Sequence, residues 1–268
     1  MAPKREEGDF VEALARGLNV IRAFSTSHLA LSVSEVATAT ELARPTARRL
    51  LLTLEHLGYV RSTDGLYMLT PKILELGLSY INAQGMWDIA RPHLVELVSK
   101  TKESSSMSQL DGSDIVYTAR VAVPKIIGMS VQIGTRFPAI ATSMGHVLLS
   151  EFSPRELDAV LKMPSQSNVV PRVKPTRKEL EAVLAEVRTR GWALSDERLS
   201  FGIRSIAAPV RDASGAIIAA VNVTTNAAET SISSLKKQHL PLLLETAECI
   251  TTDFGRMARL PTNNPLPR

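Results

Sequence analysis

The stretch that decides the fold of the first part of the chain is Leu42–Val60, which reads LARPTARRLLLTLEHLGYV. Its second half carries apolar residues at the three- and four-residue steps that line one face of a helix. These inward positions are Ala47, Leu50, Leu54 and Leu57. Its first half combines three arginines with a proline and a threonine. We predict a helix from about Arg44 to Gly58, because Pro45 suits a first turn, where its missing N–H group needs no partner.

The sequence on either side predicts two further helices and a hairpin. A helix begins near Phe10, and its apolar stripe is Leu14, Leu18, Ile21 and Phe24. Ser32 followed by Glu35 is a capping box that starts a short second helix. After the quoted stretch, Ser62–Gly65 is a turn signal between two short strands. Three helices followed by a hairpin is the order of a winged helix-turn-helix.

The arginines of the quoted stretch fit the first turns of a recognition helix. Arg44 and Arg48 lie one turn apart on the predicted outer face, where arginine can bond guanine edges and threonine can contact phosphate or a thymine methyl. A solvated helix face is the alternative, but the capping box and the hairpin favour DNA. The candidate DNA contacts are Arg16, Ser34, Arg44, Pro45, Thr46, Arg48, Arg49 and Arg61. We assign Arg16 to phosphate, and Arg61 to phosphate or the minor groove.

Length and charge allow this interpretation without requiring it. With 268 residues, of which 44% are apolar, the chain can bury a core in each of two domains. The formal net charge is +4, which permits a polyanionic partner. Residues 1–80 hold nine Lys or Arg against nine Asp or Glu, so the case for nucleic acid depends on local arrangement.

The composition also limits where the protein can act. Cys249 is the single cysteine, so the chain cannot form an internal disulfide, and we expect this thiol to be inert and buried. The longest apolar runs, such as residues 216–223, are too short to span a membrane, and the amino terminus lacks the apolar region of a secretory signal. We therefore expect a cytoplasmic protein without a membrane partner.

The remaining sequence predicts an α+β domain that follows a helical connector. Residues 71–82 and Trp87–Thr101 have a helical pattern, and an alternating β pattern begins at Ser104. The predicted strands are 115–123, 126–133, 192–197, 205–211 and 216–224, and the predicted helices are 143–150, 153–162, 176–190 and 234–257. This order indicates an antiparallel sheet with helices packed on it. Residues 1–9 and the proline-rich tail 258–268 are expected to be disordered.

A candidate binding segment is Ala141–His146, between a strand region and a helix. Free N–H groups and the positive dipole at the start of a helix attract a carboxylate, and Gly145 would let a ligand approach closely. Simple capping of the helix by Thr142 or Ser143 explains the same residues, so both interpretations stay open.

The late strands place polar groups on a face that is otherwise apolar. Ile218, Ala220, Asn222 and Thr224 share one face by the two-residue period, and Ser205 has a similar position in its own strand. Burying such polar groups costs about 1 to 3 kcal/mol each unless something bonds them. A small polar ligand is one possible partner, and the neighbouring backbone is the other.

An enzyme is the competing class, and the sequence gives it little support. The chain lacks a nucleophile elbow, a dinucleotide-binding loop and a P-loop, and its five histidines have no metal-ligand spacing. The S-x-x-K match at 233–236 is too short to be specific, and the pair Asp196-Glu197 fits a strand end or pocket rim. We expect no catalytic residue, no metal and no cofactor.

Five segments, in order, resemble the IclR family of bacterial transcriptional regulators, and most closely its branch that controls protocatechuate, 4-hydroxybenzoate and β-ketoadipate catabolism. The segments are FVEALARGLNVIRAF, SVSEVATATELARPTARRLLLTLEHLGYV, LTPKILELGLSY, ATSMGHVLL and GIRSIAAPVRD. The resemblance covers about residues 10–255. It implies a winged helix-turn-helix at 10–70, linker helices at 71–101 and a GAF-like effector domain at 102–257, assembled as dimers or dimers of dimers.

The resemblance also implies where an effector binds. Together with Gly145 from the candidate segment above, the expected contacts are Ser143, Met144, Ser195, Asp196, Ile203, Ser205, Asn222 and Thr224. Two departures matter: Glu41 and Ala43 stand where the family often has glycine and serine, so the usual serine cap of the recognition helix is missing. His146 stands where many members carry lysine, so its role is open.

The resulting prediction is a non-enzymatic, ligand-responsive regulator. It binds a palindromic double-stranded DNA operator as a homodimer or homotetramer and responds to a small carboxylate from aromatic catabolism. The alternatives are a regulator of glyoxylate or other central-carbon genes, and a small-molecule-binding enzyme or sensor whose helix-turn-helix serves only protein contact.

Overall fold

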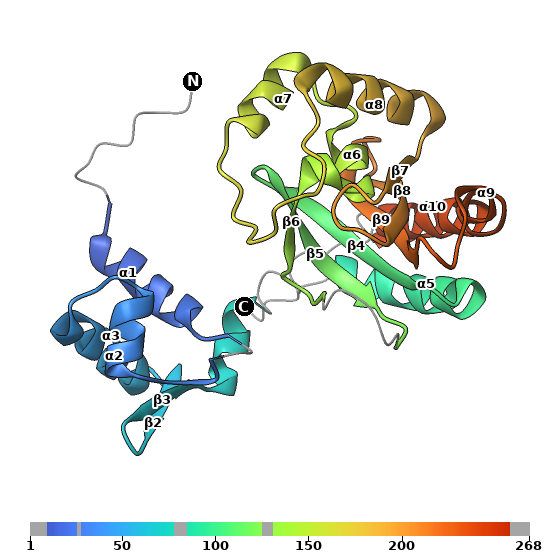
Figure 1. Ribbon diagram of the computed structural model, residues 1–268. Coiled ribbons are helices and arrows are strands. Elements are labelled where there is room, and N and C mark those ends of the chain that lie inside the picture. The colour runs from blue at the N-terminus through green and yellow to red at the C-terminus, as the bar shows by residue number, and fades with distance from the viewer. Residues whose placement is uncertain (1–9, 26–27, 78–84, 125–130, 258–268) are drawn as a thin grey trace, which may run out of the picture. The chain divides into compact units, whose positions relative to one another are not determined.

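The computed structural model describes residues 10–25, 28–77, 85–124 and 131–257 and divides the chain into two units, 1–83 and 84–268 (Figure 1). The expected loose ends at 1–9 and 258–268 lie outside the described residues, as does most of the strand expected at 126–133. The helix expected at 71–82 is described only as far as residue 77. None of the described helices combines the length and hydrophobicity needed to cross a bilayer.

The first unit has the predicted order of elements. Its elements are α1 (Glu12–Ala23), β1 (Ala30–Ser32), α2 (Val33–Ala39), α3 (Arg44–His56), β2 (Val60–Thr63), β3 (Leu66–Leu69) and the 3-10 turn η2 (Pro71–Ile73). The strands form an antiparallel sheet in the order β1-β3-β2. The winged helix-turn-helix is thus confirmed, with β1 as a strand that the sequence pattern did not indicate.

Local signals set the ends of these helices. The backbone N–H of Ser32 donates to Glu35 Oε2 at 2.7 Å and the N–H of Glu35 donates to Ser32 Oγ at 3.3 Å, which is the predicted capping box. Pro45 lies in the first turn of α3, and Ala43 at the N-cap makes no side-chain cap. The β2–β3 turn has Asp64 and Gly65 at φ +53° and +78°, the left-handed pair of a type I′ hairpin turn.

Two apolar stripes differ from the prediction. In α3, Leu51 is fully buried with Ala47 and Leu54, whereas Leu57 is 48% exposed because it is the C-cap, beyond the last helical turn. In α1, the buried residue is Val20, and the predicted Leu14 and Leu18 are exposed. In each helix a buried core residue, Val20 or Leu51, is thus the chain neighbour of a predicted inward residue, Ile21 or Leu50. The described core residues are Val20, Phe24, Leu31, Val36, Ala37, Ala47, Leu51, Leu54, Val60 and Tyr67.

The second unit is an α+β domain around a six-stranded antiparallel sheet of order β6-β5-β4-β9-β8-β7. Its strands are β4 (Ser104–Asp111), β5 (Asp114–Val121), β6 (Arg136–Pro138), β7 (Ala193–Asp196), β8 (Ile203–Arg211) and β9 (Ile217–Asn226). Its helical elements are α5 (Met86–Thr101), η3 (Ala139–Ala141), α6 (Ser143–Leu149), α7 (Pro154–Leu161), α8 (Arg177–Arg190), α9 (Ile232–Ser234), the π-helical turn η4 (Leu235–His239) and α10 (Leu240–Met257).

Helices cover both faces of this sheet (Figure 1). On one face α5 and α10 pack through residues such as Leu94, Leu97 and Leu243. On the other face α6, α7 and α8 pack through residues such as Leu149 and Leu184. The helix α5, which the sequence assigned to a linker, is therefore part of the second unit, because its apolar side is buried in that unit's core.

Three further details correct the sequence-based expectations. The strands β4 and β6 were not predicted. Ile218 packs on the sheet face that carries α5 and α10, whereas Ala220 packs on the opposite face. The reason is a register shift: Val210 pairs with Ala219 and Arg211 with Ile217, so Ile218 is an extra residue that interrupts the alternation of faces. Cys249, expected in the core, is exposed on α10.

The start of α6 depends on a glycine. Gly145 is buried, and a Cβ added to it would lie 2.0 Å from the carbonyl oxygen of Ala139. Real Cβ atoms do not approach backbone that closely, so the glycine lets α6 lie directly against η3. Gly255 in α10, by contrast, has open space where a Cβ would stand.

Replacing Gly145 by alanine should destabilise the second unit by at least about 1 to 3 kcal/mol, because the methyl group overpacks against backbone that cannot move aside. Urea unfolding followed by circular dichroism measures the change. Gly255→Ala is the matched control and should be neutral or stabilising by about 0.4 to 1 kcal/mol. Equal stability of the two variants would contradict the close approach.

Candidate functional site

The predicted DNA-contacting residues lie mainly on the outside of the first unit. Arg44, Pro45, Arg48 and Arg49 are exposed on α3, Thr46 is half-buried there, and Ser34 is half-buried on α2. Among the described residues, these three arginines form no ion pair. Arg16 differs, because its Nε is 2.9 Å from Glu12 Oε1. The first turns of α3 therefore present unpaired positive charge to solvent.

The hairpin is tied to the end of α3. Ser62 donates from its backbone N–H, at 3.1 Å, and from its hydroxyl to Oε1 of Glu55. Arg61 is the exposed neighbour of Ser62 on β2. The carboxylate of Glu55 thus holds the base of the wing, and Arg61 with it, at a set position relative to α3.

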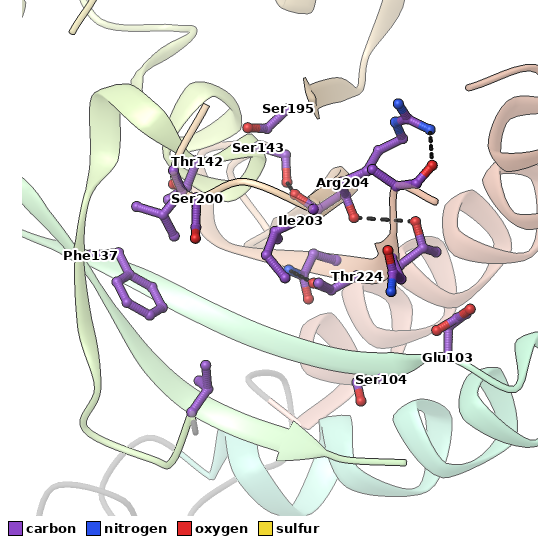
Figure 2. A pocket seen from close by; sticks show the side chains of 18 of the residues that line it. Glu103, Ser104, Phe137, Thr142, Ser143, Ser195, Ser200, Ile203, Arg204 and Thr224 are labelled. Atoms are coloured by element: carbon purple, nitrogen blue, oxygen red, sulfur yellow. Dashed lines mark hydrogen bonds between the residues drawn. The ribbon is translucent and has the colours of Figure 1, made fainter. Parts of the chain in front are cut away.

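The second unit contains a cavity of about 1060 Å³ on the sheet face that carries α6. Seven of the nine predicted effector contacts line it: Ser143, Met144, Ser195, Ile203, Ser205, Asn222 and Thr224. Figure 2 shows Phe137, Ser143, Ile203 and Thr224 around this hollow. The structure therefore brings together residues that are up to 81 positions apart in the sequence, from α6, β7, β8 and β9.

Two predicted contacts, Gly145 and Asp196, do not line the cavity. The Cα of Gly145 faces η3, so its missing side chain makes room for Ala139 rather than for a ligand. Along β7, Ser195 is buried and Asp196 is exposed, as successive residues of a strand point to opposite faces. Asp196 instead accepts from Nε of Arg204 at 2.6 Å.

The start of α6 is capped from within the chain. The N–H of Gly145 donates to Thr142 Oγ1 at 3.0 Å, so the capping interpretation of Ala141–His146 describes this helix start. Ser143 Oγ and Ser205 Oγ are 2.8 Å apart, and Ser195 Oγ donates to the carbonyl of Ala141 at 3.1 Å. These hydroxyl groups give one side of the cavity its polar lining (Figure 2).

Asn222 is engaged by neighbouring strands. Its Oδ1 accepts from the backbone N–H of Ser106 at 3.0 Å, and its Nδ2 donates to Thr224 Oγ1 at 3.0 Å. Ser105 Oγ donates to the carbonyl of Asn222 at 2.6 Å. The neighbouring backbone is therefore a hydrogen-bond partner of Asn222, as one of the two alternatives predicted. Through these bonds Asn222 joins β4 to β9 at the cavity wall.

The lining residues that sequence reasoning missed include Tyr117, Arg120 and Phe137, which come from β5 and β6. The rings of Tyr117 and Phe137 meet edge to face, with centroids 5.6 Å apart and planes at 88°. Burial raises the pKa of Tyr117 to about 12, although the charge of Arg120 and a hydrogen bond with Asn222 act in the opposite direction. The phenol is therefore neutral at physiological pH.

A bulge explains why the alternation of β5 did not identify Arg120. Tyr117 pairs with Ser108 and Ala119 pairs with Met107, so Thr118 is an extra residue in the ladder. The shift lets Tyr117 and Arg120, three positions apart, line the same cavity. No pattern in the sequence of β5 marks this irregularity.

His146 lies outside the cavity lining. Its ring is fully buried, and its Nε2 donates to the carbonyl of Ile140 at 2.8 Å. Burial lowers the pKa of His146 to about 4, so the ring is neutral at physiological pH. The side chain joins α6 to η3, which is a structural role. Within the described ranges, metal-binding side chains do not gather in groups of three or more.

Comparison with known proteins agrees with this architecture. Residues 13–64 match the IclR helix-turn-helix domain, and residues 78–252 match the family described as bacterial transcriptional regulator IclR C-terminal. The Pca regulon regulatory protein of Pseudomonas putida is 38% identical over 237 residues, covering 88% of this chain and 81% of that protein. The p-hydroxybenzoate hydroxylase transcriptional activator of Acinetobacter baylyi is 31% identical over 244 residues, covering 89% and 90%.

Solved structures are similar as well. A crystal structure of a transcriptional regulator from Rhodococcus sp. RHA1 is 46% identical with a TM-score of 0.81, covering 92% of this chain and 100% of that one. The inducer-binding domain of PobR from Acinetobacter, a double mutant in complex with 3-hydroxybenzoic acid, is 28% identical with a TM-score of 0.56, covering 62% of this chain and 97% of that one.

The family matches cover both units, and the curated relatives named above are transcriptional regulators rather than enzymes, one of them of the Pca regulon and one of p-hydroxybenzoate hydroxylase. The chain belongs to the IclR family of bacterial transcriptional regulators.

Proposed function

We propose that this regulator acts in the cytoplasm, binds a palindromic operator as a homodimer or homotetramer, and responds to a small aromatic carboxylate. The observation that carries the proposal is the cavity of about 1060 Å³, whose lining combines hydroxyl groups, an aromatic pair and arginine. Such a mixture of apolar walls with a few placed polar groups is typical of small-molecule sites.

The effector class is supported by two arguments. The PobR domain that is similar to this unit was solved with 3-hydroxybenzoic acid, an aromatic carboxylate. The lining also offers the aromatic pair of Tyr117 and Phe137, a surface for a ring that a two-carbon acid such as glyoxylate lacks. Ser143, Met144, Ser195, Ile203, Ser205, Asn222 and Thr224 are the proposed effector contacts from the predicted set.

DNA reading is assigned to the first unit. The exposed arginines of α3 would enter the major groove, and Arg61 on the wing would contact the backbone or minor groove. In a dimer, two such units must lie about 34 Å apart to read both halves of a palindrome. An effector that binds only one arrangement of the assembly shifts the population toward it, and thereby changes operator binding.

Replacing Arg48 or Arg49 by alanine should weaken discrimination between operator and unrelated duplex by about 1 to 3 kcal/mol if the side chain reads a base. Fluorescence anisotropy with an operator selected from random duplexes measures this. Arg256→Ala removes one exposed positive charge from the second unit and is the control, for which we expect no change. If both α3 variants behave like that control, α3 does not read the operator.

Replacing Arg61 by alanine should weaken binding to all duplexes alike, because a phosphate contact carries no sequence information. The slope of log K against log salt concentration should fall in magnitude by about 1. Titrations at several salt concentrations with operator and with unrelated DNA give both quantities. A loss confined to the operator would instead assign Arg61 to base reading.

Replacing Ile203 by tryptophan should abolish the effector response and leave operator binding intact, because the larger ring fills cavity space without removing a side-chain hydrogen bond. The readout is anisotropy of labelled operator with and without a hydroxybenzoate panel. Val170→Trp, at a site 77% exposed and outside the cavity lining, is the control and should respond normally. A normal response of the Ile203 variant would place the effector elsewhere.

A further inference from the structure

We propose that Arg120 binds the carboxylate of the effector and is the residue by which the cavity selects acids over their neutral analogues. This inference rests on the proposed function, in which the cavity takes an aromatic carboxylate. It adds the residue that recognises the charge, a role that the predicted contacts leave unfilled, since the seven that line the cavity are neutral.

The positive charges of the described lining single out Arg120. The charged residues that line the cavity are the acids Glu103 and Glu197 and the arginines Arg120 and Arg204, and Glu197 already accepts from the N–H of Gly202 at 2.7 Å. Arg204 is already satisfied: its Nε is 2.6 Å from Asp196 Oδ1, and its Nη1 donates to the carbonyls of Ala227 and Thr230. Its charge is therefore compensated without a ligand.

Arg120 has no such compensation within the described part of the chain. It forms no ion pair with a described acid, its Nη1 donates to the neutral hydroxyl of Ser106 at 2.9 Å, and its Nε is buried without a hydrogen-bond partner. Burial lowers the pKa of Arg120, which reflects the loss of hydration around the charge. Burying a cation costs free energy unless an anion or a hydrogen-bond acceptor compensates it. A ligand carboxylate would supply both the negative charge and the acceptor oxygens for Arg120.

The surroundings of Arg120 suit an acid that carries an aromatic ring. The β5 bulge lets Tyr117 line the same cavity, and Tyr117 forms the edge-to-face pair with Phe137. The Tyr117 phenol is neutral at physiological pH, so it does not compete with the ligand for the positive charge. A benzoate would thus find Arg120, which pairs with no described acid, close to aromatic side chains of the neighbouring strands β5 and β6.

The other site considered for a carboxylate, the start of α6, is less suitable. Thr142 Oγ1 already accepts the N–H of Gly145, and α6 has only seven residues. The partial positive charge of so short a helix is weak compared with a full guanidinium charge. The geometry therefore favours Arg120 as the anion partner.

The test compares 3-hydroxybenzoate with its neutral analogue 3-hydroxybenzamide by isothermal titration calorimetry on the full-length protein. The variants are Arg120→Gln, which removes the charge, and Arg120→Lys, which keeps it without the planar guanidinium. Arg211→Gln is the matched control: Arg211 is also a strand arginine, but it pairs with Glu151 and does not line the cavity. Thermal melting without ligand checks that each variant is folded.

We expect the natural protein and Arg211→Gln to prefer the acid strongly over the amide. Arg120→Gln should bind the acid about 10- to 100-fold more weakly, the change expected when a charge-assisted hydrogen bond is lost, while its affinity for the amide stays within about threefold. Arg120→Lys should fall between the two, and it carries the same comparison if the glutamine variant is unfolded.

Two other results would overturn the inference and are distinguishable. If Arg120→Gln binds 3-hydroxybenzoate as tightly as the natural protein, Arg120 does not recognise the carboxylate, whereas the proposed effector class stands. If the natural protein binds neither 3-hydroxybenzoate nor any other hydroxybenzoate of a panel, the proposed effector class fails and the role of Arg120 fails with it.

Discussion

The second unit depends on the pairing of β4 with β9 at the centre of its sheet. β4 is rich in serine, and a buried polar strand is stable only if its groups are bonded. Asn222 meets this requirement, because its side chain and its carbonyl accept from Ser106 and Ser105 of β4. The same contact fixes the position of Ser106, to which Arg120 donates. The hydrogen bonds of Asn222 to β4 thus help to position the part of the cavity wall that contains Ser106 and Arg120.

Elements with strong local signals were predictable from the sequence, whereas elements set by long-range pairing were not. The capping box at Ser32 and Pro45 at the start of α3 depend on neighbours within a few residues, and both appear as predicted. The turn predicted over Ser62–Gly65 is present but shorter, because Ser62 and Thr63 belong to β2. The β pattern that begins at Ser104 did not single out β4 as a strand of its own, because most of its residues are polar and its partners are β5 and β9 on either side. The packing of α5 into the core of the second unit was not foreseen for the same reason, because its partners lie far along the chain.

The site shows the same division. Alternation correctly placed Ser205, Asn222 and Thr224 on one face, because the ladder is regular there. It misplaced Ile218 and overlooked Arg120, because each lies beyond a register shift that the sequence does not reveal. The glycine of α6 was noticed for the right property, the absence of a side chain, but the group that uses the space is backbone rather than ligand.

The two units have separate apolar cores, one formed by residues of α1, α2, α3 and the wing and the others by the large sheet and its helices. Substitutions in the cavity lining therefore leave the packing that supports α3 untouched. Chemical preference and operator preference can diverge independently during evolution under this arrangement. We also expect chimaeras that join this second unit to the DNA-binding unit of another family member to fold, because each unit has its own apolar core.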